Sequence, residues 1–186
     1  MSGFEYAGNQ SHGDICGASR RFDIPSDNAG RLGRGDVVTL TGDSNAADGE
    51  AEVVIASQGA RMAGVIMGFE PDIANESFTD AGGIAATTAG KAFVMTDENA
   101  LFEVECSATL AAANVGLNAD AVVTAATQSG GLTMSNMTLD QGTVAATATL
   151  HFKIHKLLPG KTSGTLGDRA LVSIAGSYLK GDITGV

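Results

Sequence analysis

Apolar and polar residues alternate from Thr143 to Lys156, the most regular pattern in the chain. In an extended conformation six apolar side chains share one face: Val144, Ala146, Ala148, Leu150, Phe152 and Ile154. The opposite face carries polar side chains, including His151 and Lys153. A period of two is typical of a strand that is buried on one face only. The pattern therefore predicts a strand over 143–156, with His151 and Lys153 accessible or at an interface.

Short apolar segments bounded by turn residues predict further strands along the chain. These segments are 36–41, 52–57, 62–69, 91–96, 101–106, 121–126, 132–139 and 170–175. The polar run at 97–99 resembles the turn of a hairpin, and 108–113 favours one short helical turn. Many short strands with Gly-marked turns predict an all-β fold, a β-barrel or sandwich that comprises residues 31–186.

Residues 1–30 differ from this pattern and are predicted to form an extended N-terminal arm. They are polar and Gly-rich, without a regular apolar period. Aromatic residues and arginines anchor many protein interfaces. We therefore expect the arm to be disordered in the isolated protein and ordered on a partner, and deletion of 1–21 to leave a folded domain. Its candidate residues for an interface with a partner or a sister subunit are Phe4, Tyr6, Arg20, Arg21 and Phe22.

Charge and composition narrow the classes of partner. The chain has 186 residues, with 21 acidic and 11 basic side chains and a formal net charge of -10. A surface of this sign repels phosphate backbones, so nucleic-acid binding is not expected. We expect no membrane span, because no apolar run is long enough, and no secretory signal, because residues 1–6 have neither a basic nor an apolar region. Cys16 and Cys106 are expected to be free thiols in a reducing cytosol.

Three clusters of chemically versatile residues are candidate sites. His151 and His155 would lie roughly 13 Å apart on a strand, too far to share one zinc ion. The acidic run 43–50 departs from the spacing of a calcium loop and is better explained as a hairpin turn. Glu103 and Glu105 share a strand face, but the chain has no Trp and only two Tyr to hold a sugar. We expect no catalytic residues, metal or cofactor, and hence no enzyme.

Three segments, in this order, resemble the capsid decoration (cement) proteins of tailed phages. The first combines Phe-Asp-Ile-Pro-Ser at 22–26 with Gly-Asp-Val-Val-Thr-Leu at 35–40, similar to that family's entry strand and Gly-Asp-x-Val step. The second is the apolar run 60–69, similar to a buried Gly-Val-x-x-Gly strand. The third comprises 102–104, 112–120, 139–140, 150–154 and 170–174.

The resemblance implies a non-enzymatic β-barrel-like module on the outer surface of the virion capsid, made in the host cytoplasm. It would stabilise contacts between major capsid subunits, and it carries over no catalytic residue. A homo-oligomer is expected, with a trimer preferred to a dimer, because decoration sites lie on symmetry axes of shells. The alternative is a receptor-binding or glycan-binding β-module of a phage tail or cell surface.

Overall fold

The computed structural model describes residues 3–10, 19–71 and 82–175. These residues form sixteen strands and two three-residue 3-10 helices, which confirms the all-β prediction. The strands of the barrel are β2 (Ser19–Ile24), β4 (Val37–Ser44), β5 (Ala51–Ile55), β6 (Gly64–Phe69) and β8 (Gly90–Met95). Those of the main sheet are β1 (Glu5–Asn9), β9 (Ala100–Glu105), β10 (Asn118–Ala119), β15 (Phe152–Pro159) and β16 (Leu166–Ile174).

The remaining elements are shorter. They are β3 (Leu32–Gly33), β7 (Gly83–Ile84), β11 (Ala121–Val122), β12 (Thr127–Ser129), β13 (Leu132–Met134), β14 (Thr138–Leu139), η1 (Ala112–Asn114) and η2 (Gln141–Thr143). None of the helical segments seen in the described part of the chain has the length and apolar character needed to span a bilayer.

The first lobe is a closed barrel with the strand order β2-β5-β4-β6-β8. Strand β2 closes it, running parallel to β5 and antiparallel to β8. The barrel interior is filled by aliphatic side chains together with Phe22, which belongs to the same buried cluster as Ile24, Val53 and Ile66. A short barrel needs such bulky residues on its inner face, because the interior is just wide enough for side chains to fill.

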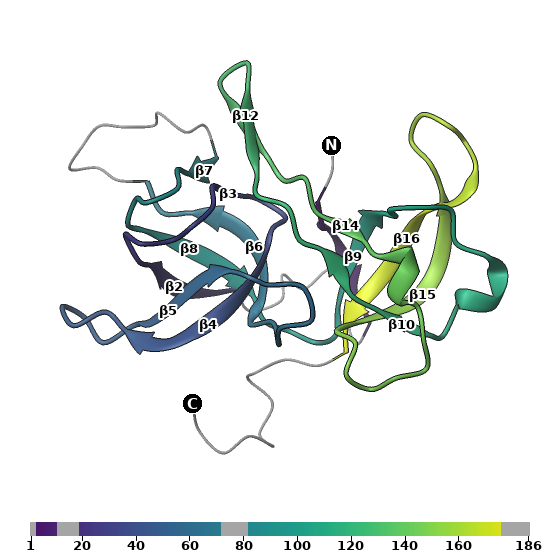
Figure 1. Cartoon of the computed structure of the whole chain (residues 1–186), viewed down its shortest axis with the longest axis horizontal. Helices are drawn as coiled ribbons and strands as arrows, with labels where there is room; N and C mark the ends of the chain where they lie inside the picture. Colours follow the sequence, from purple (N-terminus) through teal and green to yellow (C-terminus); the bar gives the residue numbers. More distant parts are fainter. Residues whose placement is uncertain (1–2, 11–18, 72–81, 176–186) are drawn as a thin grey trace.

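The second lobe is an antiparallel sheet with the order β1-β9-β16-β15-β10. In Figure 1 it lies to the right of the barrel, with the long β15–β16 pair at its centre. Strand β9 alternates buried and half-buried residues, as a strand with one wet face should. Phe102 and Val104 of β9 thereby face the core.

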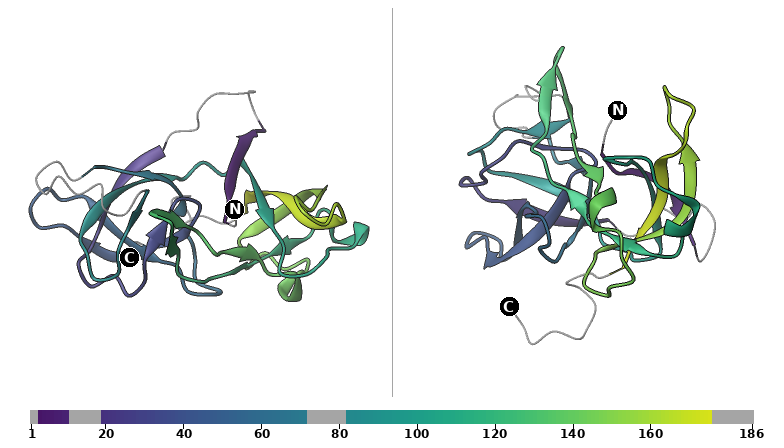
Figure 2. Two further views of the ribbon diagram at one scale, coloured as in Figure 1. Left: turned by 90° about the horizontal axis from the view of Figure 1, so that it is seen from above. Right: turned by 45° about the vertical axis from the view of Figure 1, so that its right-hand side comes forward.

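One hydrophobic core joins the two lobes, which lie side by side in both views of Figure 2. Barrel residues Val37, Val65 and Met95 belong to the same buried cluster as Phe102 and Phe152 of the sheet. Each lobe therefore covers apolar surface that the other would expose to water, and we expect the described parts of the chain to unfold together.

The strand predicted over 143–156 is only partly correct. Strand β15 begins at Phe152, and the prediction is confirmed from there, with Phe152 and Ile154 buried and Lys153 exposed. Residues 144–151 form a loop instead, and His151 is buried rather than accessible. Asp120 holds this loop at its end, because its Oδ1 accepts the His151 backbone N–H at 3.2 Å and lies 2.8 Å from His151 Nδ1. These contacts hold the chain in a bend just before β15 begins.

In the described residues, segments of the arm predicted at 1–30 pair with strands of the domain predicted at 31–186. Residues 19–24 are strand β2 of the barrel, and residues 5–9 pair with β9 in the sheet. Neither segment alternates along its length: β2 passes from three exposed residues to three buried ones, and the register of β1 shifts between Tyr6 and Gly8. The expected disorder of the arm in the isolated protein stays a prediction, and residues 11–18 lie outside the described residues.

The hairpin predicted around 97–99 is likewise not formed. Strand β8 pairs with β2 and β6, whereas β9 pairs with β1 and β16. The three polar residues instead carry the chain from the barrel to the sheet. The sequence pattern predicts two strands and a turn here, but it does not predict which strands pair. That pairing depends on which apolar faces are buried together in the core.

Candidate functional site: an apolar groove beside a projecting hairpin

The hairpin β12–β13 stands out from the body of the molecule (Figures 1 and 2). Its turn is Gly130-Gly131, with φ angles of 59° and 82°. Two successive positive φ angles produce the tight turn whose twist matches that of paired strands, and glycine adopts them without strain. The sequence thus specifies the hairpin locally.

The hairpin exposes large apolar side chains to solvent. Leu132 is 60% exposed and Met134 is 38% exposed, while Thr133 between them is buried. Thr133 packs against Gly83 so closely that a Cβ added there would lie 2.4 Å from the Thr133 Cγ2. This contact fixes which face of β13 points inward. Leu132 and Met134 are therefore held outward by the fold.

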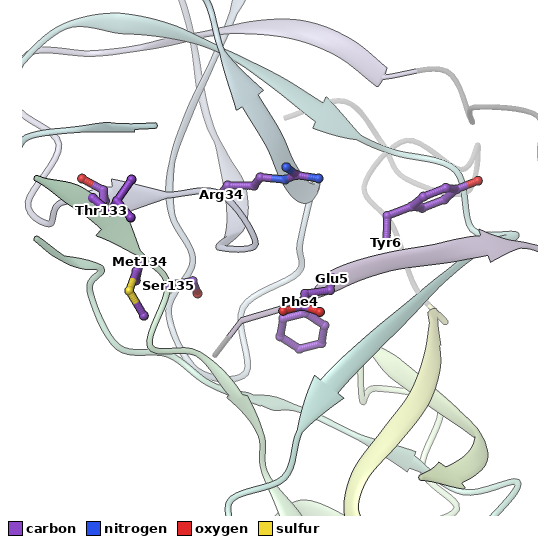
Figure 3. A pocket seen from close by; sticks show the side chains of 8 residues that line it. Phe4, Glu5, Tyr6, Arg34, Thr133, Met134 and Ser135 are labelled. Carbon is purple, nitrogen blue, oxygen red and sulfur yellow. The ribbon is translucent and has the colours of Figure 1, made fainter. Parts of the chain in front are cut away.

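A groove of about 510 Å³ lies between this hairpin and strand β1. Figure 3 shows Arg34 between the hairpin residues Thr133 and Met134 and the β1 residues Glu5 and Tyr6. Phe4, Leu132 and Ser135 complete the lining. The groove combines aromatic and aliphatic walls with a single arginine, which is the composition of many protein recognition sites.

The charge in the groove that no neighbouring side chain neutralises is positive, although the chain as a whole carries a formal net charge of -10. Glu5 is held by Lys161, whose Nζ lies 3.0 Å and 2.9 Å from the two carboxylate oxygens. Arg34 is exposed, and within the described ranges it forms no hydrogen bond or ion pair. The groove therefore offers an unpaired guanidinium to an incoming ligand.

Asp36 lies buried behind the groove and is held by Gly33 and Ser135. Its Oδ2 accepts the Gly33 backbone N–H at 2.7 Å. Burial raises the pKa of Asp36 from an ordinary 3.8 to about 6, although the hydrogen bonds from Ser135 and Gly33 act in the opposite direction. Because the folded state favours the neutral acid, the ionised carboxylate opposes folding.

We expect Asp36→Asn to stabilise the protein at pH 7. The wild-type loses stability as pH rises from about 4 through about 6, since only the unfolded chain ionises freely there. An asparagine oxygen still accepts the Gly33 N–H but carries no charge. Each pH unit between the unfolded and folded pKa values corresponds to about 1.4 kcal/mol, so the gain above pH 6 is at most roughly 3 kcal/mol. It should vanish below pH 4. Urea unfolding at both pH values measures it, and equal gains at both would contradict this explanation.

The structure separates the five interface residues predicted from the sequence. Phe4 and Tyr6 do line the groove, Phe4 with its ring buried and Tyr6 in an edge contact with Phe102. Phe22 lies inside the barrel and is not available to a partner. Arg21 pairs within the chain, with Nη2 2.6 Å from Glu50 Oε1. Arg20 is exposed on β2, away from the groove lining.

The sequence reasoning missed Arg34, Leu132 and Met134. The Gly130-Gly131 pair between two short alternating segments was a usable signal for an exposed hairpin. No local signal places Arg34 opposite residues that lie about a hundred positions later. That proximity is a consequence of the tertiary fold.

A second cluster brings together the carboxylates of Asp23, Asp48 and Glu50, with oxygen atoms within 4.8 Å of one another. The ammonium of Lys91 lies among them, 2.8 Å from Asp23 Oδ1 and 3.2 Å from Glu50 Oε2. The hydrogen bonds that Lys91 donates to Asp23 and Asp48 raise the pKa of Lys91, and Lys91 lowers the pKa of Asp48. Lys91 thus occupies the position that a cation would take.

We expect Lys91→Met to lower the melting temperature by several degrees, because Asp23 and Asp48 then lose their cation and Glu50 keeps only Arg21. Millimolar Ca²⁺ should restore part of the loss in the variant, since oxygen ligands suit that ion. The wild-type melting temperature should not respond to Ca²⁺. Scanning calorimetry with and without Ca²⁺ measures both. A wild-type response equal to that of the variant would contradict the role given to Lys91.

Most residues of the remaining clusters considered from the sequence have partners within the chain. His155 Nε2 lies 2.8 Å from Ser173 Oγ, and Glu103 pairs with Arg169. The 45–50 turn joins β4 to β5, as expected for a hairpin turn. Burial, Asp168 and Glu105 raise the pKa of the Cys106 thiol to about 12, so the thiolate is disfavoured. Cys16 lies outside the described residues. The expected lack of a metal at His151 and His155 stays a prediction.

Comparison with protein-family profiles, with curated proteins and with solved structures found no match for this chain.

Proposed function

We propose that the protein is a non-enzymatic capsid decoration protein, which binds the outside of a phage head shell and stabilises contacts between major capsid subunits. The observation that carries this proposal is the projecting β12–β13 hairpin with its exposed Leu132 and Met134. Large apolar side chains held outward beside an apolar groove favour binding to another protein. The strands of the hairpin are already paired with each other, which reduces the conformational entropy lost on docking.

The resemblance to decoration proteins supports the same function. Its segments coincide with the framework of the molecule, because they fall on β2, β4, β6, β9, β15 and β16. The hairpin lies between the matching segments and is free to differ with the shell that it binds. The net charge of -10 would keep decorated particles apart in solution.

Many copies on one shell reinforce a modest interface. Each copy bound at a symmetry axis contacts several capsid subunits at once, so the contributions add across the particle. We propose a homo-oligomer, with a trimer preferred to a dimer, as the unit that binds. Analytical ultracentrifugation of the isolated protein reports this state directly.

The test is co-sedimentation with phage heads assembled without this protein. The double variant Leu132→Ser, Met134→Ser should bind at least about tenfold more weakly, since each buried aliphatic side chain contributes on the order of 1.5–3 kcal/mol. Because both side chains are exposed, the variant should keep its melting temperature. Leu166→Ser is the matched control, since Leu166 is 61% exposed but lies on β16, outside the groove.

Two results would overturn the proposal. One is that the wild-type protein does not sediment with heads at micromolar concentration. The other is that the double variant and Leu166→Ser both bind as tightly as the wild-type. Binding to host cells or polysaccharide in place of heads would favour a receptor-binding module.

A further inference from the structure

We propose that the groove between β1 and the β12–β13 hairpin binds an extended acidic segment of the capsid subunit, with an apolar side chain in the groove and a carboxylate paired with Arg34. This inference rests on the function proposed above and names the chemistry of the partner at that site.

The shape of the groove favours a peptide segment. A volume of about 510 Å³ lies within the range of roughly 300–1,000 Å³ typical of ligand sites. Its exposed apolar surface comes from Leu132 and Met134, while Phe4 lies buried behind the lining. Burying an aliphatic or aromatic side chain against Leu132 and Met134 removes apolar surface from water on both partners.

The charges favour an acidic partner over a basic one. Arg34 is the lining residue whose charge has no counterpart in the described parts of the chain, because Lys161 already neutralises Glu5. A guanidinium binds a carboxylate through two parallel hydrogen bonds, which fixes orientation as well as sign. Next to apolar walls, such a pair is screened less by solvent than one on an open surface. A lysine in the same place would meet Arg34 as a like charge.

The apolar surface of the groove and the Arg34 guanidinium lie close enough for one peptide segment to contact both. In Figure 3 the Arg34 side chain extends along the groove toward Tyr6, with Phe4 and Glu5 below it and Met134 across the space. An acidic residue close to a large apolar residue in an extended segment satisfies both contacts at once. Neighbouring side chains of a strand point to opposite faces, so residues two apart supply the pair.

The first test uses defined peptides and the full chain. The probes are a fluorescein-labelled acetyl-Gly-Asp-Ala-Phe-Ala-Asp-Gly-amide and its analogue with both aspartates replaced by lysine. Fluorescence anisotropy should show at least tenfold tighter binding of the acidic peptide. Arg34→Gln should abolish that preference. Arg61→Gln, at an exposed arginine outside the groove lining, should retain it.

The second test uses heads and separates this inference from the proposed function. Arg34→Gln should bind heads about tenfold more weakly than Arg61→Gln. Peptide discrimination without any binding to heads would support the groove chemistry and overturn the decoration function. Equal binding of heads by both variants would leave decoration standing and overturn the role of Arg34. Failure of the acidic peptide to bind at millimolar concentration, or equal affinity for both peptides, would also overturn it.

Discussion

Phe4→Ala should lower the free energy of unfolding by about 3–5 kcal/mol, the usual result of truncating a fully buried aromatic side chain. The Phe4 ring is buried and stacks on Phe152, with ring centroids 4.3 Å apart and planes inclined by 18°. Truncation leaves a cavity in the core that both lobes share. Urea unfolding followed by circular dichroism measures the loss, and Phe152→Ala should lose a similar amount.

Phe93→Ala is the matched control, because Phe93 is 37% exposed on strand β8. It should lower stability by less than about 1 kcal/mol. The double variant Phe4→Ala, Phe152→Ala should lose less than the sum of the single losses, since the stacked pair couples the two sites. If Phe4→Ala behaved like Phe93→Ala, residues near Phe4 would not be part of the core, and an independent N-terminal arm would again be the better description.

Because Phe4 lies in the core, we no longer expect a folded domain after deletion of residues 1–21. That deletion removes β1 together with Phe4, and it removes the first half of β2 from the closed barrel. Loss of a core aromatic and of a barrel-closing strand should leave a chain that does not fold cooperatively. A folded domain is therefore not the expected product of this truncation.

Sequence periodicity predicted those strands whose burial pattern is regular. The run 62–69 was predicted as a buried strand and forms β6, and the alternation around Phe152 and Ile154 forms β15. In both places large β-branched, aliphatic or aromatic residues leave little choice of facing. The all-β class followed from several such segments together.

The alternation failed where its apolar members were small. Residues 144–149 are Val, Ala and Thr only, and burying or exposing an alanine changes the free energy little. Asp120, about thirty positions earlier, then decides the conformation by holding His151. A contact at that separation leaves no trace in a local pattern.

The positions of the N-terminal segments were even harder to predict from a local sequence pattern. Phe4, Tyr6 and Phe22 have no regular spacing, which favoured an arm that binds elsewhere. Their neighbours are supplied by β9, β15 and β8, which lie from about seventy to a hundred and fifty positions away. The groove depends on similar distances, since Arg34 meets residues 132–135 only after both lobes assemble.

Gly64→Ala should destabilise the protein by more than about 3 kcal/mol, the upper part of the range for overpacking. Gly64 begins β6, where the barrel passes from β4 to β8. A Cβ added there would lie 2.1 Å from the Met95 carbonyl oxygen and 2.8 Å from Val94 Cγ1. The nearer atom belongs to the backbone, so relief requires two strands to separate rather than one side chain to rotate.

Gly68→Ala is the control on the same strand, because a Cβ there meets no atom within 4 Å. It should change stability by no more than about 1 kcal/mol, and a small gain is reasonable since alanine restricts the unfolded chain. Thermal unfolding of the two variants under one set of conditions measures the difference between them. Similar stabilities of the two variants would mean that β6 and β8 do not approach each other this closely. The barrel would then not be closed between these two strands.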